Sequence, residues 1–152
     1  KGGNGCSLVL PGPGGPRELL FLHDFYWERQ TERTPCGWPF LFPICGRLER
    51  DGQSEHYLHD GQLRRLPIHG FDPRVPWTVG EVGKDDAIEL RLEDSEETRA
   101  AYPFRFEVLL RYRVLEGALL CAQTYTNRGS EPMPYYAGFH PYFRTPPPGA
   151  GK

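Results

Sequence analysis

Glycine and proline recur along the whole chain, and their number constrains the fold more than any other feature of the sequence. The 152 residues include 18 glycines and 16 prolines. Proline removes a helical hydrogen bond and glycine favours turns, so long helices have little room and an all-β fold is predicted. Hydrophobic residues make up 38% of the chain, which is enough apolar material for one packed domain over residues 1–152.

Several segments show the patterns typical of antiparallel strands. Residues 87–93 (AIELRLE) and 104–115 (FRFEVLLRYRVL) alternate apolar and polar side chains, which indicates strands with one buried face. A turn at Glu116-Gly117 is followed by residues 118–127, the predicted antiparallel return. Asp60-Gly61, between two short strand-like segments, is typical of a tight type I′ hairpin. Together these signals predict a large antiparallel β-sandwich.

The remaining segments give shorter signals. Two apolar runs, 6–10 (CSLVL) and 18–27 (ELLFLHDFYW), are separated by PGPGGP, which indicates two strands joined by a turn. Residues 133–143 (MPYYAGFHPYF) are expected to be extended. Residues 95–102 (SEETRAAY) are the one predicted helical turn, with Ser95 as its N-cap and acidic residues in its first turn.

Charge and composition argue against several classes of protein. The formal net charge is −2, and the arginines alternate with acidic and apolar residues, so a nucleic-acid partner is not expected. No run approaches the roughly 20 apolar residues of a membrane span, and we expect a soluble, cytoplasmic protein. The four cysteines contain no CxxC pair and are expected to be reduced thiols. His56 and His59 are three residues apart but have no third ligand nearby, so exposed hairpin histidines are favoured over a metal site.

Three polar residues lie in unusual apolar surroundings. His140 is enclosed by AGFHPYFR, His69 lies between Pro67-Ile68 and Gly70-Phe71, and Arg47 directly follows an apolar run and a glycine. Taken singly, a packed histidine or a surface ion pair explains each of them. Their shared setting, at the junctions of strands with Gly-rich and Pro-rich loops, instead suggests one polar site.

Four motifs in order, FPICGRL, LPIHGFDPRVPW, TRAAYPFRFEVLLRY and MPYYAGFHPYF, resemble the aldose 1-epimerase (galactose mutarotase-like) family, in particular its bacterial branch. The resemblance spans nearly the whole chain. It implies a large antiparallel β-sandwich, often called a supersandwich, whose concave face holds a sugar. It implies an isomerase that interconverts the α and β anomers of a hexose, with no metal and no organic cofactor.

The resemblance also implies roles for individual residues. His140 matches the general acid of the family, His69 its second active-site histidine, and Arg47 its substrate-binding arginine. Histidine suits acid-base ring opening because it gains and loses a proton near neutral pH. Flat apolar surface for the sugar is expected from Phe71, Trp77 or Tyr142, although core packing explains these rings equally well.

The chain departs from the family pattern at its C-terminal end. The family's catalytic glutamate and a second, substrate-holding aspartate follow the GFHPYF motif, whereas this chain ends at Lys152. The sequence thus predicts an incomplete sandwich, corresponding to the N-terminal half of the fold. This chain alone is expected to be inactive, and its exposed sheet is expected to be covered by self-association unless the sequence is truncated.

Two other functions remain open. One is a hexose-6-phosphate 1-epimerase, for which a phosphate clamp is available in four arginines: Arg64, Arg65, Arg74 and Arg144. The other is a carbohydrate-binding sandwich that keeps the pocket without the acid-base pair. The expected partner is a monosaccharide or a sugar phosphate in each case.

Overall fold

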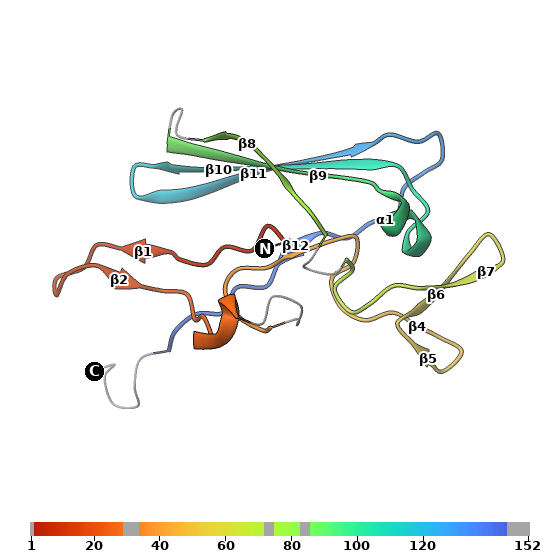
Figure 1. Ribbon diagram of the computed structural model, residues 1–152, viewed down its shortest axis with the longest axis horizontal. Helices are drawn as coiled ribbons and strands as arrows, with labels where there is room; N and C mark the ends of the chain where they lie inside the picture. Colours follow the sequence, from red (N-terminus) through yellow and green to blue (C-terminus); the bar gives the residue numbers. More distant parts are fainter. Residues whose placement is uncertain (1, 29–33, 72–74, 83–85, 146–152) are drawn as a thin grey trace.

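An antiparallel four-stranded sheet is the largest element of the computed structural model, which describes residues 2–28, 34–71, 75–82 and 86–145 (Figure 1). The strands lie in the order β11-β10-β9-β8. Their bounds are Thr78–Val82 for β8, Ala87–Glu93 for β9, Phe106–Leu115 for β10 and Ala118–Asn127 for β11. The predicted strand at 87–93 and the predicted return at 118–127 are confirmed, and β10 begins two residues later than predicted.

Alternation along β10 determines which face of this sheet is buried. Phe106, Val108 and Leu110 are at most 1% exposed, whereas Arg111 on the opposite face is exposed. The β10–β11 turn places Glu116 at φ 50° and Gly117 at φ 77°. Two successive residues with positive φ are the geometry of a type I′ turn, which matches the twist of the flanking strands.

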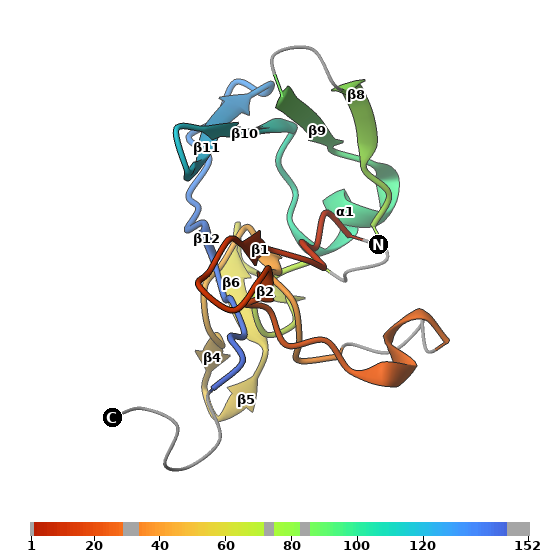
Figure 2. The same cartoon turned by 90° about the vertical axis from the view of Figure 1, so that its left-hand side faces the viewer.

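The rest of the chain forms paired short strands that lie beneath the main sheet in Figures 1 and 2. The pair closest to the centre joins β3 (Phe40–Leu41) to β12 (Gly138–Phe139). At one end lies the pair β1 (Val9–Leu10) and β2 (Arg17–Glu18). At the other end lie the pair β4 (Glu49–Arg50) and β5 (Gln53–Ser54) and the hairpin β6 (His56–His59) and β7 (Gln62–Arg65).

The β6–β7 hairpin confirms the prediction made from Asp60-Gly61. Both residues have positive φ, 49° and 70°, and His59 pairs with Gln62 across them. The predicted helical turn is also confirmed as α1 (Glu96–Ala101), in which the Ser95 side chain accepts the Thr98 N–H. Tyr57 on β6 donates a hydrogen bond to the carbonyl of Ala101 at 2.8 Å, which ties this helix to the hairpin.

The apolar core lies between the main sheet and the segments beneath it. Phe42, Phe71 and Phe106 are in mutual ring contact, with centroid separations of 5.1–5.9 Å. The buried members of the core come from both layers: Phe42, Ile44, Leu66, Val75, Leu92, Tyr102, Phe104, Phe106, Val108 and Leu110. The β3–β12 pair is therefore held against the sheet by aromatic packing.

Two predicted strands are much shorter than the sequence suggested. The apolar run 18–27 contributes only Glu18 to a strand and ends in a 3-10 helix, Asp24–Trp27. Its Tyr26 N–H bonds to the His23 carbonyl, and this local turn buries the Tyr26 ring. The predicted extended segment 133–143 keeps only Gly138–Phe139 in a strand pair, since Pro134 and Pro141 have no N–H to donate to a ladder.

Several large apolar side chains remain exposed on the main sheet, many of them toward the β10–β11 turn: Val79, Val82, Ile88, Val114, Leu115, Leu119 and Leu120. The predicted self-association through an exposed sheet remains a prediction. None of the helices among the described residues has the length and apolar character needed to cross a bilayer.

Candidate active site

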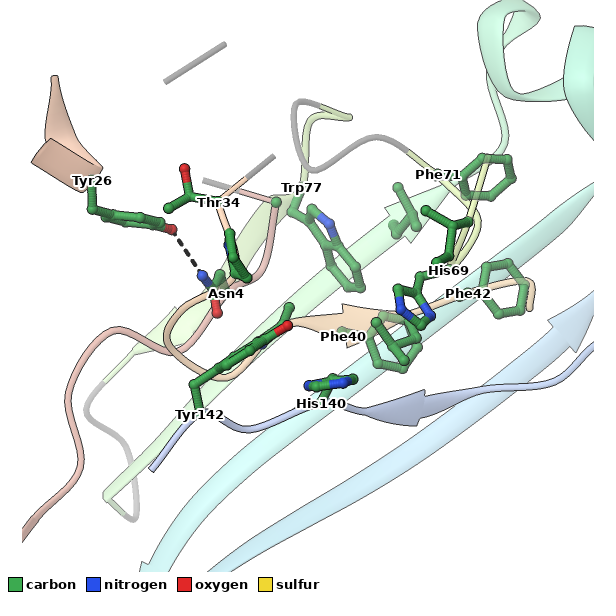
Figure 3. Close-up of a pocket in the computed structure, with 16 residues that line it drawn as sticks. Asn4, Tyr26, Thr34, Phe40, Phe42, His69, Phe71, Trp77, His140 and Tyr142 are labelled. Atoms are coloured by element: carbon green, nitrogen blue, oxygen red, sulfur yellow. Dashed lines mark hydrogen bonds between the residues drawn. The ribbon is translucent and has the colours of Figure 1, made fainter. Parts of the chain in front are cut away.

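A pocket of about 330 Å³ opens beside β3 and β12. Figure 3 shows two imidazoles facing each other at one end, Asn4 and Tyr26 at the other, and the rings of Trp77 and Tyr142 between them. Five of the six predicted site residues line this pocket: His69, Phe71, Trp77, His140 and Tyr142. Residues far apart in the sequence are thus brought to one cavity of the size that small-molecule sites have.

His140 follows β12 directly and is held by its backbone. Its N–H donates to the carbonyl of Pro39 at 3.1 Å, next to the β3–β12 pair. The imidazole stacks on the Tyr142 ring, with centroids 4.7 Å apart and planes at 24°. The side chain is exposed rather than packed in the core. A bound molecule can therefore reach this imidazole.

His69 lies opposite, with its ring centroid 5.7 Å from that of His140. Two hydrogen bonds join it to Gly46: the His69 N–H donates to the Gly46 carbonyl at 2.7 Å, and the Gly46 N–H donates to His69 Nδ1 at 3.0 Å. The backbone of His69 is left-handed, with φ 65°. A residue other than glycine rarely adopts this conformation, which costs about 1–2 kcal/mol, so the paired hydrogen bonds hold a strained position.

The neighbouring backbone fixes the loop that carries His69. Gly70 has φ 86°, and a Cβ on it would lie 2.0 Å from the Phe42 carbonyl oxygen. The Phe71 N–H donates to that same oxygen at 2.9 Å. On the other side, a Glu55 carboxylate oxygen accepts the Ile68 N–H at 3.3 Å. The loop is therefore attached to β3 on one side and to the segment between β5 and β6 on the other.

Arg47 is the predicted site residue that is not brought into the pocket wall. It is exposed and follows Gly46, both of whose backbone groups bond His69. The pKa of Glu55 is lowered mainly by its hydrogen bond with the Arg65 guanidinium, and the positive charge of Arg47 also lowers it. Arg47 thus lies near the carboxylate that supports the His69 loop, and its substrate-binding role remains a prediction.

Cys45, immediately before this glycine, lacks the surroundings of an activated nucleophile. Its sulfur lies against Gly138, where a Cβ would meet it at 3.2 Å. Burial raises the pKa of its thiol. The thiolate is the reactive form of cysteine, so the environment of Cys45 disfavours nucleophilic chemistry. The structure pairs none of the four cysteines in a disulfide, and their reduced state remains a prediction.

The far end of the pocket contains polar residues that the sequence did not single out. The Asn4 side-chain amide donates to the Tyr26 hydroxyl at 3.0 Å and to the Cys36 carbonyl at 3.2 Å. Burial, followed by the hydrogen bond with Cys6, raises the pKa of Tyr26, so its hydroxyl remains protonated. Tyr26 lies in the run 18–27, which was interpreted only as a strand, and nothing in the sequence around Asn4 marks it.

The chemistry available in this pocket is hydrogen bonding and proton transfer by imidazole. Of the residues that the structure describes, no aspartate or glutamate lines the pocket. Nor do the described residues include a group of three or more His, Cys, Asp or Glu side chains placed to hold a metal ion. Two histidines beside flat aromatic walls are suited to a small polar ring with hydroxyl groups, such as a sugar.

The fold is an antiparallel β-sandwich of the galactose mutarotase-like class. The sequence profile described as aldose 1-epimerase matches residues 2–150. The chain therefore belongs to the aldose 1-epimerase family. The predicted family and the predicted mutarotase-like β-sandwich are both confirmed.

Individual relatives agree with this assignment. Among curated proteins, the chain is 29% identical over 128 residues to the plasmid-encoded protein LacX of Lactococcus lactis subsp. lactis, covering 81% of this chain and 42% of LacX. It is 28% identical over 113 residues to an Escherichia coli (strain K12) protein named "Putative glucose-6-phosphate 1-epimerase", covering 72% of this chain and 34% of that protein. The chain thus spans less than half the length of these curated relatives.

Solved structures show the same architecture. The Slr1438 protein from Synechocystis sp. PCC 6803 superposes with a TM-score of 0.76 at 33% identity, over 90% of this chain and 50% of that one. A galactose mutarotase related enzyme from Lactobacillus acidophilus superposes with a TM-score of 0.73 at 26% identity, over 98% of this chain and 50% of that one.

Proposed function

We propose that this chain provides the acid and much of the sugar-holding surface of an aldose 1-epimerase site, with His140 as the general acid. The observation that supports this most directly is the pairing of His69 and His140 across the pocket, with ring centroids 5.7 Å apart. Both imidazoles come from motifs that resemble the active-site motifs of the family. The substrate is a hexose that lies between these imidazoles and the aromatic walls.

The proposed reaction opens and recloses the sugar ring. A base removes the proton from the C1 hydroxyl, the C1 oxygen becomes a carbonyl, and the bond between C1 and the ring oxygen breaks. The electron pair goes to the ring oxygen, which takes a proton from His140. Rotation about the C1–C2 bond and the reverse steps then give the other anomer. Phe71, Trp77 and Tyr142 provide flat surfaces for the sugar's C–H face.

The base is expected to be a carboxylate, as the family resemblance implies. No described carboxylate lines the pocket, and the chain spans about half the length of its solved relatives. We therefore assign the base to the part of the family fold that lies outside the match. Arg47 directly follows Gly46, the residue that hydrogen-bonds to His69. We propose that it binds sugar hydroxyls at the rim of the pocket.

Exchange NMR between the α and β anomers tests this function. Glucose and galactose are mixed with the 152-residue chain and with the natural gene product that carries this sequence. We expect exchange with the natural product, and a loss of about 100-fold or more in His140→Ala, the usual range for removing a general acid. His56→Ala is the matched control, because His56 lies on the β6 hairpin outside the pocket. Unchanged exchange in His140→Ala would remove this residue from the mechanism.

A hexose 6-phosphate is the second candidate substrate, because one relative carries that name. The arginines considered as a phosphate clamp do not support it. Arg65 pairs with Glu55 at 2.8 Å, Arg64 donates to Gln62, and Arg144 donates to the Leu20 carbonyl. None of these three lines the pocket, and Arg74 lies outside the described residues. Including glucose 6-phosphate and galactose 6-phosphate in the exchange panel distinguishes the two substrate classes.

A carbohydrate-binding protein without catalysis is the third candidate. It predicts sugar-induced chemical-shift changes at the pocket residues with no enhancement of anomer exchange in the natural product. The same NMR samples therefore separate binding from catalysis. We also propose a cytoplasmic location, because four free thiols are typical of a reducing compartment.

A further inference from the structure

We propose that Asn4 is a specificity-determining residue, whose amide oxygen accepts a hydrogen bond from the C3 or C4 hydroxyl of the sugar at the end of the pocket opposite the two imidazoles. This inference rests on the proposed function and assigns a substrate group to the polar end of the same pocket. Three features support it: an amide with a fixed orientation, a buried oxygen without a partner, and a pocket wall without charged side chains among the described residues.

The neighbours of Asn4 determine which way its amide points. Its side-chain nitrogen donates to the Cys36 carbonyl at 3.2 Å and to the Tyr26 hydroxyl at 3.0 Å. A backbone carbonyl only accepts hydrogen bonds, so the NH2 group and not the oxygen must face Cys36. Both amide hydrogens are used in this way, and the amide oxygen points away from Tyr26 (Figure 3). The protein itself therefore sets the orientation of the amide.

Close packing holds this amide in place. Gly37 has φ 74°, and a Cβ on it would lie 2.9 Å from both the nitrogen and the oxygen of the Asn4 side chain. Gly5 and Trp38 exchange two backbone hydrogen bonds, at 3.2 and 2.8 Å, which join the Asn4 segment to the same stretch of chain. The Gly37 carbonyl in turn accepts the Tyr142 N–H at 2.8 Å. The amide and the aromatic wall of the pocket thus share one support.

The amide oxygen of Asn4 is the feature that points to a ligand. It is buried and has no hydrogen-bond partner in the described part of the chain. Burying an acceptor without a donor is unfavourable, and native proteins keep few such groups. Asn4 lines the pocket, so a ligand that occupies this end can supply the missing donor. Because the oxygen only accepts, the ligand group must carry a hydrogen, as a hydroxyl does.

The pocket wall favours a neutral hydroxyl over an anionic substituent at this end. Among the residues that the structure describes, neither lysine nor arginine lines the pocket. Burial raises the pKa of Tyr26, so the hydroxyl beside Asn4 stays uncharged. A phosphate buried here would lack a positive partner, which is costly, whereas a hydroxyl needs only hydrogen bonds.

The geometry of the sugar ring identifies the hydroxyl. In the proposed reaction His140 protonates the ring oxygen, so the bond between C1 and the ring oxygen lies at the imidazole end of the pocket. In a pyranose the C3–C4 bond is on the opposite side of the ring, and its hydroxyls point away from the reacting bond. Figure 3 shows Asn4 at the end of the pocket opposite His140. The C3 or C4 hydroxyl is therefore the group that meets Asn4.

Nuclear Overhauser spectroscopy of glucose bound to the natural gene product tests this orientation without any activity measurement. We expect contacts between the Tyr26 ring protons and H3 or H4 of the sugar, together with a shift of the Asn4 side-chain amide signals. Contacts from Tyr26 to H1 would reverse the orientation and overturn the inference, as would unchanged Asn4 signals in glucose-saturated protein. Failure of the proposed function is recognised separately, because it appears in the exchange rate of His140→Ala.

A thermodynamic cycle of binding constants tests the role of Asn4 itself. In the wild type, 3-deoxyglucose or 4-deoxyglucose should bind about 3-fold to 10-fold more weakly than glucose, the range for one lost hydrogen bond. Asn4→Leu has a side chain of similar size that cannot hydrogen-bond, so it should bind glucose and that deoxy sugar equally. Asn127→Leu is the matched control, because Asn127 ends β11 outside the pocket, and it should keep the wild-type preference.

Two results of this cycle would refute the inference. One is a folded Asn4→Leu protein that keeps the full preference for glucose over both deoxy sugars. The other needs no variant and therefore holds even if Asn4→Leu does not fold: wild-type protein that binds 3-deoxyglucose and 4-deoxyglucose as tightly as glucose has no such hydrogen bond.

Discussion

Replacing Gly70 with alanine tests whether the close contact beneath His69 determines both stability and the site. The φ of 86° alone costs an alanine about 1–2 kcal/mol. The added Cβ would also lie 2.0 Å from the Phe42 oxygen and 2.7 Å from the Pro43 nitrogen. Both are backbone atoms, so the β3 segment or the His69 loop must move, and such overpacking typically costs a further 1–3 kcal/mol or so.

Gly61 provides a matched control. It lies in the β6–β7 turn with φ 70°, and no atom lies within 4 Å of the position that its Cβ would take. Gly61→Ala therefore carries only the conformational cost, about 1–2 kcal/mol, and the difference between the two variants isolates the close contact. We expect Gly70→Ala to be destabilised by about 2–5 kcal/mol in total.

Urea unfolding followed by tryptophan fluorescence measures both variants against the wild type. If Gly70→Ala loses no more stability than Gly61→Ala, the contact with Phe42 is not as tight as described. A histidine NMR spectrum of folded Gly70→Ala adds a second readout, because a shifted loop would alter the His69 signals and leave those of His56 unchanged.

Two further predictions concern regions outside the pocket. Ser95→Ala removes the side-chain cap of α1, which should cost about 1 kcal/mol and lower the Tm by about 2–4 °C, while Ser54→Ala at an exposed strand position should not change it. The hydrogen bond from Ser7 is the main cause that lowers the pKa of Glu18, so folding favours the carboxylate, and this stability is lost as the pH falls below the ordinary value of 4.5. Between neutral pH and about pH 3, Glu18→Gln should therefore lose less stability than the wild type, as measured by the urea midpoint at each pH. Equal decreases of the urea midpoint with pH in the two proteins would contradict this.

Local chemistry explains which elements were predictable from the sequence. Asp60-Gly61 and Glu116-Gly117 occupy left-handed positions, which glycine tolerates in both turns and the short Asp60 side chain tolerates in the first, so each turn is favoured by its own residues. The Ser95 cap acts within one helical turn. The alternation in β10 is long enough that no helix could bury the same side chains. These features need no information from distant parts of the chain.

Long-range packing explains what could not be predicted. Residues 18–27 have strand-like composition, yet burial of Tyr26 and its contact with Asn4 favour a 3-10 turn, and Asn4 is far away in sequence. The candidate site was predicted residue by residue through the family resemblance, but the sequence could not show that Gly46 hydrogen-bonds to the ring of His69. That contact depends on where two loops meet.

The pairing of β3 with β12 also has a consequence for the order of folding. Phe40 pairs with Phe139, so β3 lacks this strand partner until β12 has left the ribosome. The β6–β7 and β10–β11 hairpins close locally and can form much earlier, because short loops carry little closure entropy. The pocket between the two imidazoles therefore cannot form before β12 emerges, and a nascent chain stalled before β12 would contain closed hairpins without His140 opposite His69.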